Sequence, residues 1–230
     1  MKRDIACGLR DRKFFLSKRT FIIGSQAAYS LELAEIILEL GRPKPTLVDN
    51  LDPDQRAALA EEVRVGNPGK LTYFAAPGVP GIRKIISLWA KEIGLEPAVA
   101  LTHQTASISQ SAQLRGGVTV NRLAAIAAGV HCYEHVQINR LASIGHDSVL
   151  EAFVTVGPGV VVCGSVTVRR GAYIGAGSVL TPGVTVGRDS VIGAGSIVLG
   201  DVPDCTTWVG NPARLVKNQS TGFGGYSSVS

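Results

Sequence analysis

The chain has 230 residues, of which 45% are hydrophobic and 18% charged, which excludes a short peptide scaffold and a globally disordered protein. The formal net charge is +5, and residues 1–19 account for all of it with seven basic and two acidic residues. The remaining chain is balanced, so the charge predicts no nucleic-acid surface on the body of the protein. We expect residues 1–19 to form a flexible basic arm.

Membrane insertion and disulfide formation are both disfavoured by the sequence. No apolar run approaches the roughly 18 residues that cross a bilayer, and charges occupy the first twenty residues, where a signal peptide needs an apolar stretch. The four cysteines, at positions 7, 132, 163 and 205, lie far apart without a CxxC pair. The sequence therefore predicts a cytoplasmic protein with reduced thiols and no integral membrane span.

Residues 20–101 alternate between strand and helix patterns, which favours a small parallel α/β domain of the Rossmann-like kind. In the first helical segment Leu31, Ala34, Ile37 and Leu40 share one side, and Asp52 and Asp54 are cap candidates for the second. We expect strands over 20–24, 46–49, 71–75 and 98–101, and helices over 29–40, from the cap candidates to Val63, and over 82–93.

Two polar segments follow the first two expected strands. Ligands of parallel α/β domains bind at the carboxyl ends of the strands, where Gly24-Ser25-Gln26 and Asp49-Asn50 stand. Backbone N–H groups after the first strand can hold phosphate, and a carboxylate after the second can bind a ribose or a base. These five residues are the candidate substrate-binding cluster, although Gly24 could simply turn the chain and Asp49 could simply cap a turn.

A six-residue repeat fills the second half of the chain. Stepping by six from Thr102 to Val198 gives seventeen positions, of which fifteen are Ile, Leu or Val. Four residues further on, every hexad has Ala, Val or Ser. This pattern predicts short parallel strands stacked in rungs, with the aliphatic row inside and the small residue at a tight corner.

The residue before each small corner residue is Gly in seven hexads and Asp in three, types that tolerate positive φ. A corner every six residues predicts a three-sided prism with eighteen residues per coil and about five and two-thirds coils. We expect this β-helix over residues 102–217, followed by a flexible tail over 218–230.

Asp201-Val202-Pro203 and Val209-Gly210-Asn211-Pro212-Ala213-Arg214 close the repeat, and with it they resemble the hexapeptide-repeat acyltransferases, which implies a left-handed parallel β-helix. The α/β domain before it makes residues 20–217 similar to the sialic acid O-acetyltransferase-like family, which includes bacterial N-acetyltransferases of nucleotide-linked amino sugars. Four further segments resemble this family, namely Gly81-Ile82-Arg83-Lys84, Leu101-Thr102-His103, Ala106-Ser107-Ile108-Ser109 and Ile144-Gly145-His146-Asp147.

The resemblance implies a homotrimer that transfers an acyl group from a coenzyme A thioester, expected to be acetyl-CoA, to an amino or hydroxyl group of a nucleotide-linked sugar. Thr155, Ala176 and Ala194 match donor-contacting positions of the family, and Arg214 and Lys217 could meet coenzyme phosphates. The first loop departs from the family, because Gly24-Ser25-Gln26-Ala27-Ala28 stands where members have a Gly-Ala-Gly-Gly-His-like sequence.

A histidine is the best general base for such a transfer near neutral pH. His146 lies two positions after an interior residue and should sit at a prism corner, and it matches the catalytic histidine of the family. Asp147 matches the acidic residue that follows the catalytic histidine in the family. Asp also recurs in the row before the small corner residue because it tolerates positive φ, so Asp147 could have that role alone. We expect His103 to be a packed residue at the domain junction and His135 to occupy a corner.

Two other classes of function remain open at this stage. One is a noncatalytic β-solenoid whose first domain binds a ligand. The other is a metal-dependent hydratase like the γ-class carbonic anhydrases, which would need His131, His135 and His146 as ligands. His131 and His146 are about 10 Å apart along the strand direction, too far to share one zinc ion within a subunit. We therefore expect no metal.

Overall fold

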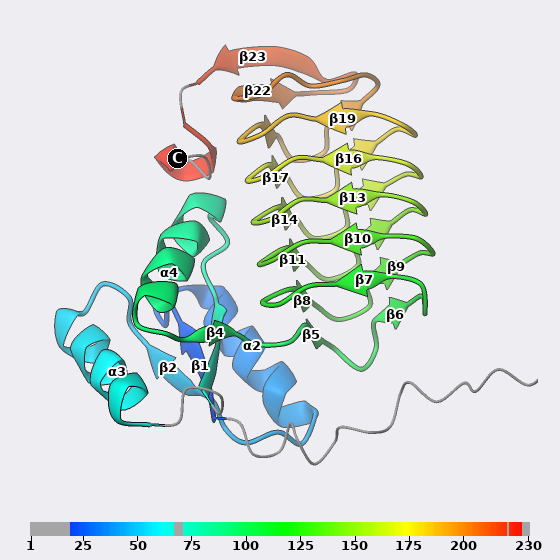
Figure 1. Ribbon diagram of the computed structural model, residues 1–230. Coiled ribbons are helices and arrows are strands. Elements are labelled where there is room, and N and C mark those ends of the chain that lie inside the picture. Colours follow the sequence, from blue (N-terminus) through cyan, green and yellow to red (C-terminus); the bar gives the residue numbers. More distant parts are fainter. Residues whose placement is uncertain (1–18, 67–70, 220, 227–230) are drawn as a thin grey trace, which may run out of the picture.

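The computed structural model describes residues 19–66, 71–219 and 221–226, so the expected basic arm lies outside the described residues except for Arg19. The chain forms an α/β domain, a β-helix and a capping hairpin in sequence order (Figure 1). The α/β domain lies beside the lower coils of the β-helix, and the hairpin covers the upper end. Among the described residues no helix has the length and apolar character needed to cross a membrane.

The α/β domain has a four-stranded parallel sheet in the order β2-β1-β3-β4. Its core is formed by aliphatic and aromatic side chains on both sides of the sheet. Asp52 caps α3, because its carboxylate accepts the backbone N–H groups of Asp54 and Gln55. The elements are β1 (Arg19–Ile23), α2 (Ala28–Glu39), β2 (Thr46–Val48), α3 (Pro53–Val65), β3 (Leu71–Ala75), α4 (Pro80–Glu92) and β4 (Glu96–Pro97).

Two expectations for this domain were wrong. The fourth strand lies over Glu96–Pro97 instead of 98–101, because Glu96 pairs with Thr72 and the chain then leaves the sheet to begin the β-helix. Of the four residues expected to share one side of α2, Ile37 is buried and Ala34 and Leu40 pack against the core, whereas Leu31 is 61% exposed. The buried side is shifted toward Leu33 and Ile36. α2 is turned in this way because it lies between the sheet and the β-helix and offers a polar side to the latter.

The β-helix is a prism of seventeen two-residue strands, as the hexads predicted, and it is left-handed, as the family resemblance implied. Strands one coil apart pair in parallel, for example His131 with Val149 and Gln137 with Thr155, so each full coil has eighteen residues. The inner row forms one continuous core. In chain order the strands are β5 (Leu101–Thr102), β6 (Ser107–Ile108), β7 (Gln113–Leu114), β8 (Thr119–Val120), β9 (Ala125–Ile126), β10 (His131–Cys132), β11 (Gln137–Ile138), β12 (Ser143–Ile144), β13 (Val149–Leu150), β14 (Thr155–Val156), β15 (Val161–Val162), β16 (Thr167–Val168), β17 (Tyr173–Ile174), β18 (Val179–Leu180), β19 (Thr185–Val186), β20 (Val191–Ile192) and β21 (Ile197–Val198).

The prism has three faces, which we number by their first strands. The first face contains β5, β8, β11, β14, β17 and β20, the second contains β6, β9, β12, β15, β18 and β21, and the third contains β7, β10, β13, β16 and β19. The α/β domain contacts the first face. Tyr29 and Arg83 bond to the outward residues Thr119 and Gln137, and the carbonyl of Gly78 accepts from Thr155.

The corners turn with positive φ, as predicted for the seven glycines and for Asp147 and Asp189. Leu123, Leu141 and Phe153 also adopt it, although residues of this size rarely do. Asp201 was expected in this set and is not, because the last coil is shorter. Ile192 pairs with Trp208, sixteen residues later, and Cys205 takes the positive φ instead.

The last coil ends in β22 (Thr206–Val209), which pairs antiparallel with β23 (Arg214–Asn218). Residues 218–230 were expected to form a flexible tail. Asn218 instead ends β23, and residues 221–226 contain a short 3₁₀ helix, η2 (Phe223–Gly225), and return to the upper end of α4 (Figure 1). The ring of Phe223 stacks on that of Tyr173, so this part of the tail contacts the prism.

Candidate active site

His146 and Asp147 form a side-chain pair at the corner between the second and third faces. Nδ1 of His146 lies 2.9 Å from Oδ2 of Asp147, and the two side chains are 67% and 69% exposed. The left-handed turn at Asp147, with φ of 58°, places both side chains outside the prism. The corner position expected for His146 is therefore confirmed.

This geometry fixes what the imidazole can do. When Nδ1 donates its proton to the Asp147 carboxylate, Nε2 keeps a free lone pair and can accept a proton from a nucleophile. The carboxylate then stabilises the imidazolium that forms. The pair is thus suited to general-base chemistry at a solvent-accessible corner.

Two glycines that the sequence analysis overlooked make room for this pair. A Cβ added at Gly164 would lie 2.5 Å from Nε2 of His146, and one added at Gly129 would lie 2.4 Å from Oδ1 of Asp147. Each glycine is one coil of eighteen residues away from its partner. Coil arithmetic could have found both, because the repeat places residues eighteen apart directly above one another.

The candidate substrate-binding cluster assembles as expected at the carboxyl edge of the sheet. Gly24 adopts φ of 100°, and its N–H and that of Ser25 both donate to the carbonyl of Val48. Nε2 of Gln26 donates to Oδ2 of Asp49 at 3.0 Å. A Cβ added at Gly24 would lie 3.4 Å from Oδ1 of Asn50, so all five residues are gathered around one turn.

A third segment, which the sequence did not single out, completes this cluster. Pro77, which follows β3, lies so close to Gly24 that an added Cβ would be 2.6 Å from its Cδ. The next residue, Gly78, accepts a hydrogen bond of 2.8 Å from Oγ1 of Thr155. Thr155 is therefore buried between the α/β domain and the first face, at the base of this cluster.

The other two predicted donor positions lie at the corner between the first and second faces. Ala176 and Ala194 are exposed and one coil apart, and the N–H of Gly195 donates to the carbonyl of Ala176. Pro158-Gly159, Ala176-Gly177 and Ala194-Gly195 give this corner a smooth strip in its later coils. In the earlier coils the same corner carries Arg122-Leu123 and Arg140-Leu141.

Helix α2 links the substrate-binding cluster to that corner. Glu32, near the start of α2, pairs with Arg140 at 2.9 Å, whereas Glu39, at its end, pairs with Arg122 one coil earlier. Glu39 also accepts from Nε2 of His103, which is buried at the domain junction as expected. The start of α2 therefore lies beside a later coil than its end does. For this reason the Gly24–Gln26 turn, which precedes α2, lies on the side of the later coils, where the smooth strip is. His146 lies across the second face, at the other edge.

A buried arginine fixes the two domains to each other. Arg83 of α4 is fully buried and donates to the carbonyl oxygens of Pro77, His135, Phe153 and Val154 and to Oε1 of Gln137. Burial lowers the pKa of Arg83 to about 9, so the guanidinium stays charged at neutral pH. Its bonds to the first face hold the substrate-binding cluster in one position relative to the prism.

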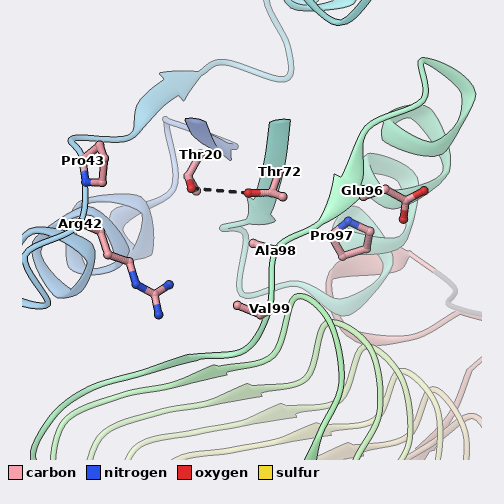
Figure 2. Close-up of a pocket in the computed structure, with 8 residues that line it drawn as sticks. All are labelled: Thr20, Arg42, Pro43, Thr72, Glu96, Pro97, Ala98 and Val99. Carbon is pink, nitrogen blue, oxygen red and sulfur yellow. Dashed lines mark hydrogen bonds between the residues drawn. The ribbon is translucent and has the colours of Figure 1, made fainter. Parts of the chain in front are cut away.

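A separate cavity of about 80 Å³ opens at the opposite, amino-terminal edge of the sheet (Figure 2). The hydroxyl groups of Thr20 and Thr72 point toward each other there, 3.5 Å apart, and Arg42 and Glu96 also line it. It contains none of the predicted site residues. Within residues 19–66, 71–219 and 221–226, no group of three or more His, Cys, Asp or Glu side chains could hold a metal ion.

Comparison with known proteins agrees with the repeat and the fold. The family model described as bacterial transferase hexapeptide (six repeats) matches residues 165–200. A histidine variant of perosamine N-acetyltransferase from Caulobacter crescentus, solved with CoA and GDP-perosamine, is 28% identical with a TM-score of 0.80, covering 86% of this chain and 97% of that one. No curated protein sequence matches the chain.

Two further solved structures have the same architecture. The acetyltransferase domain of PglB from Neisseria gonorrhoeae, solved with acetyl coenzyme A, is 25% identical with a TM-score of 0.76 and covers 87% of this chain and 100% of its own. WeeI from Acinetobacter baumannii shares the fold at 17% identity, with a TM-score of 0.75 and coverage of 86% and 100%. The repeat of this chain is therefore that of the bacterial hexapeptide transferases, and its two-part fold is that of acetyltransferases. The similar structures at 25% identity or more are sugar-modifying N-acetyltransferases and an acetyltransferase domain solved with its coenzyme.

Proposed function

We propose that the chain transfers the acetyl group of acetyl-CoA to an amino or hydroxyl group of a nucleotide-linked sugar in the cytoplasm, with His146 as the general base. The observation that carries this proposal is the His146–Asp147 pair at an exposed corner of an acetyltransferase fold. The structural relatives were solved with acetyl coenzyme A or with CoA and GDP-perosamine.

In the proposed reaction Nε2 of His146 removes a proton from the acceptor nitrogen or oxygen as that atom attacks the thioester carbonyl. The tetrahedral intermediate then expels coenzyme A as its thiolate, which takes up a proton, and the acetyl group remains on the sugar as an amide or an ester. Asp147 holds Nδ1–H and so keeps Nε2 unprotonated for the next turnover.

The acceptor is assigned to the Gly24, Ser25, Gln26, Asp49 and Asn50 cluster. Polar groups at the carboxyl edge of a parallel sheet are suited to a nucleotide. The donor is assigned to the smooth strip, where Ala176 and Ala194 leave backbone groups accessible to the pantetheine arm. The hydroxyl of Thr155 supports the acceptor cluster through its bond to Gly78, and the predicted donor contact of Thr155 is assigned to its backbone.

The separation of these parts supports the proposed homotrimer. Within one chain the acceptor cluster lies beside the first face, the donor strip lies at the corner between the first and second faces, and His146 lies at the far edge of the second face. The outward residues of the second face become aliphatic in the later coils, namely Val161, Val179 and Ile197. A closed three-fold ring would bring the His146 corner of one subunit beside the donor strip of the next, and so complete the site.

Release of free coenzyme A thiol from acetyl-CoA tests the proposed function, with a panel of nucleotide-linked amino sugars as acceptors. We expect release that depends on one or a few of these sugars, and mass spectrometry of the product distinguishes an amide from an ester. Absence of release with every acceptor would favour the noncatalytic β-solenoid. Stoichiometric zinc in the purified protein would favour the hydratase.

A further inference from the structure

The C-terminal segment 221–226, which we call the strap, is held on the first face of the prism. The ring of Phe223 stacks on Tyr173 of β17 with centroids 3.8 Å apart and an interplanar angle of 6°. Gly222 is buried beside Asp189, where an added Cβ would lie 3.1 Å from Oδ1. Before the strap, Nε2 of Gln219 donates to the carbonyl of Asp189. These contacts attach the strap to the upper coils.

The other end of the strap contacts the start of α4. A Cβ added at Gly81 would lie 2.3 Å from Cβ of Tyr226, and one added at Gly224 would lie 3.2 Å from Cγ1 of Val79. Gly81 lies in the first turn of α4 and is buried. The strap therefore bridges the prism and residues 79–81, as the C-terminal end above α4 shows in Figure 1.

Residues 79–81 continue directly from the third segment of the acceptor cluster. Pro77 lies against Gly24, its carbonyl accepts from Arg83, and Gly78 accepts from Thr155. Residues 77–81 thus have the acceptor turn on one side and the strap on the other. Movement of this segment would change the position of Gly24 without touching Ala176 or Ala194.

We propose that the strap is a positioning element for acceptor binding: Phe223 and Tyr226 hold residues 77–81 against the prism and thereby fix the wall of the acceptor cluster. This inference rests on the proposed function, which assigns the acceptor to that cluster. None of the strap contacts described above involves the smooth strip or the His146 corner. Its loss should therefore weaken acceptor binding selectively.

The test uses the full chain carrying Phe223→Ala, which removes the stack on Tyr173. A stacked aromatic pair contributes enough for loss of the stack to speed local opening by about 2- to 10-fold. We expect hydrogen exchange in peptides covering 77–84 to accelerate by that factor. The KM for the acceptor should rise by a similar factor, while the KM for acetyl-CoA stays unchanged. Val216→Ala is the matched control, because Val216 on β23 is 66% exposed.

Gly81→Ala displaces Tyr226 from the other side of the contact. We expect it to accelerate exchange in the full chain and to add little in the Phe223→Ala variant, in which the strap is already released from the prism. Unchanged exchange in all of these variants would overturn the inference, and so would faster exchange with an unchanged acceptor KM. If exchange becomes faster but the protein acetylates no sugar, the strap contact is supported and the proposed function is refuted. If the protein acetylates a sugar but exchange is unchanged in the variants, the proposed function is supported and the strap inference is refuted.

Discussion

The guanidinium of Arg83 donates to the carbonyl oxygen of His135 at 3.1 Å, across an interface between residues 52 positions apart in the sequence. His135 itself is 2% exposed, turns a corner with φ of 59°, and stacks on Phe153 at 5.4 Å. Nε2 of its ring lies 3.2 Å from the hydroxyl group of Tyr73. One buried arginine and one buried histidine thus join the α/β domain to the corner between the third and first faces.

Replacement of Arg83 by Met should uncouple the two domains. The change leaves several buried carbonyl oxygens without a donor, at about 1–3 kcal/mol for each. The chain has two tryptophans, Trp89 in α4 and Trp208 in β22, so fluorescence of single-tryptophan versions reports each domain separately. In the Arg83→Met variant we expect the unfolding midpoint reported by Trp89 to fall to a lower urea concentration than the midpoint reported by Trp208. Arg64→Met, at an exposed pair, is the control and should move neither.

Stability should fall in acid because of His135. Burial, and then the charge of Arg83, lower its pKa from 6.5 to about 4. The unfolded chain therefore takes up a proton at higher pH than the folded protein does, and stability falls as the pH drops from 6.5 toward 4. The full effect is about 3 kcal/mol. Urea midpoints across this range should fall less steeply in His135→Asn, since Asn also tolerates positive φ. Equal slopes in the two proteins would contradict this assignment.

His146→Ala should lower kcat by about 10²- to 10⁴-fold, the usual contribution of a general base. Because the side chain is exposed, the urea midpoint should stay within error of the parent. Asp147→Asn keeps a group that suits the corner backbone and removes the carboxylate that accepts from Nδ1, so we expect a smaller loss of kcat. Steady-state thiol release measures the kcat of both variants. Near-normal turnover in His146→Ala would exclude it as the base.

Gly164→Ala tests the orientation of the imidazole without altering His146. The added methyl group would lie 2.5 Å from Nε2, so the ring must turn away from its position. We expect kcat to fall by about 10-fold or more, as misplacement of a reacting group does, with little change in either KM. Gly200→Ala is the matched control, because a Cβ there meets nothing within 4 Å. Equal kcat values for the two variants would show that the ring position is unimportant.

A site shared between subunits predicts complementation. His146→Ala removes the base, and Ala194→Trp fills the donor strip at its corner, so each pure variant should be inactive. After both are unfolded together and refolded, some sites in mixed trimers combine an intact base with an intact strip, and thiol release should reappear. Mixing without refolding is the control. Lack of recovery in mixed trimers verified by mass would place the whole site within one chain.

The repeat made the prism predictable from sequence because each hexad fixes the burial of its own residues. Thr102 to Val198 occupy the inner row without a break, and His146 was placed at a corner by counting alone. The positive φ at Leu123 and Phe153 was not predictable from residue type, since the stacked coils impose that conformation. The role of Arg83 in joining the two domains was not predictable, because its hydrogen bonds reach residues up to 71 positions away in the sequence.

The shortened last coil decides how the prism ends. A column of identical coils presents an open edge onto which another parallel rung, from another molecule, could add. Here β22 follows β20 after sixteen residues instead of eighteen, and β23 then reverses the strand direction with Arg214 and Lys217 exposed along it. The terminal edge therefore offers the wrong polarity and register for a further coil. The same repeat that forms the His146 corner is in this way prevented from adding a further rung to its first face.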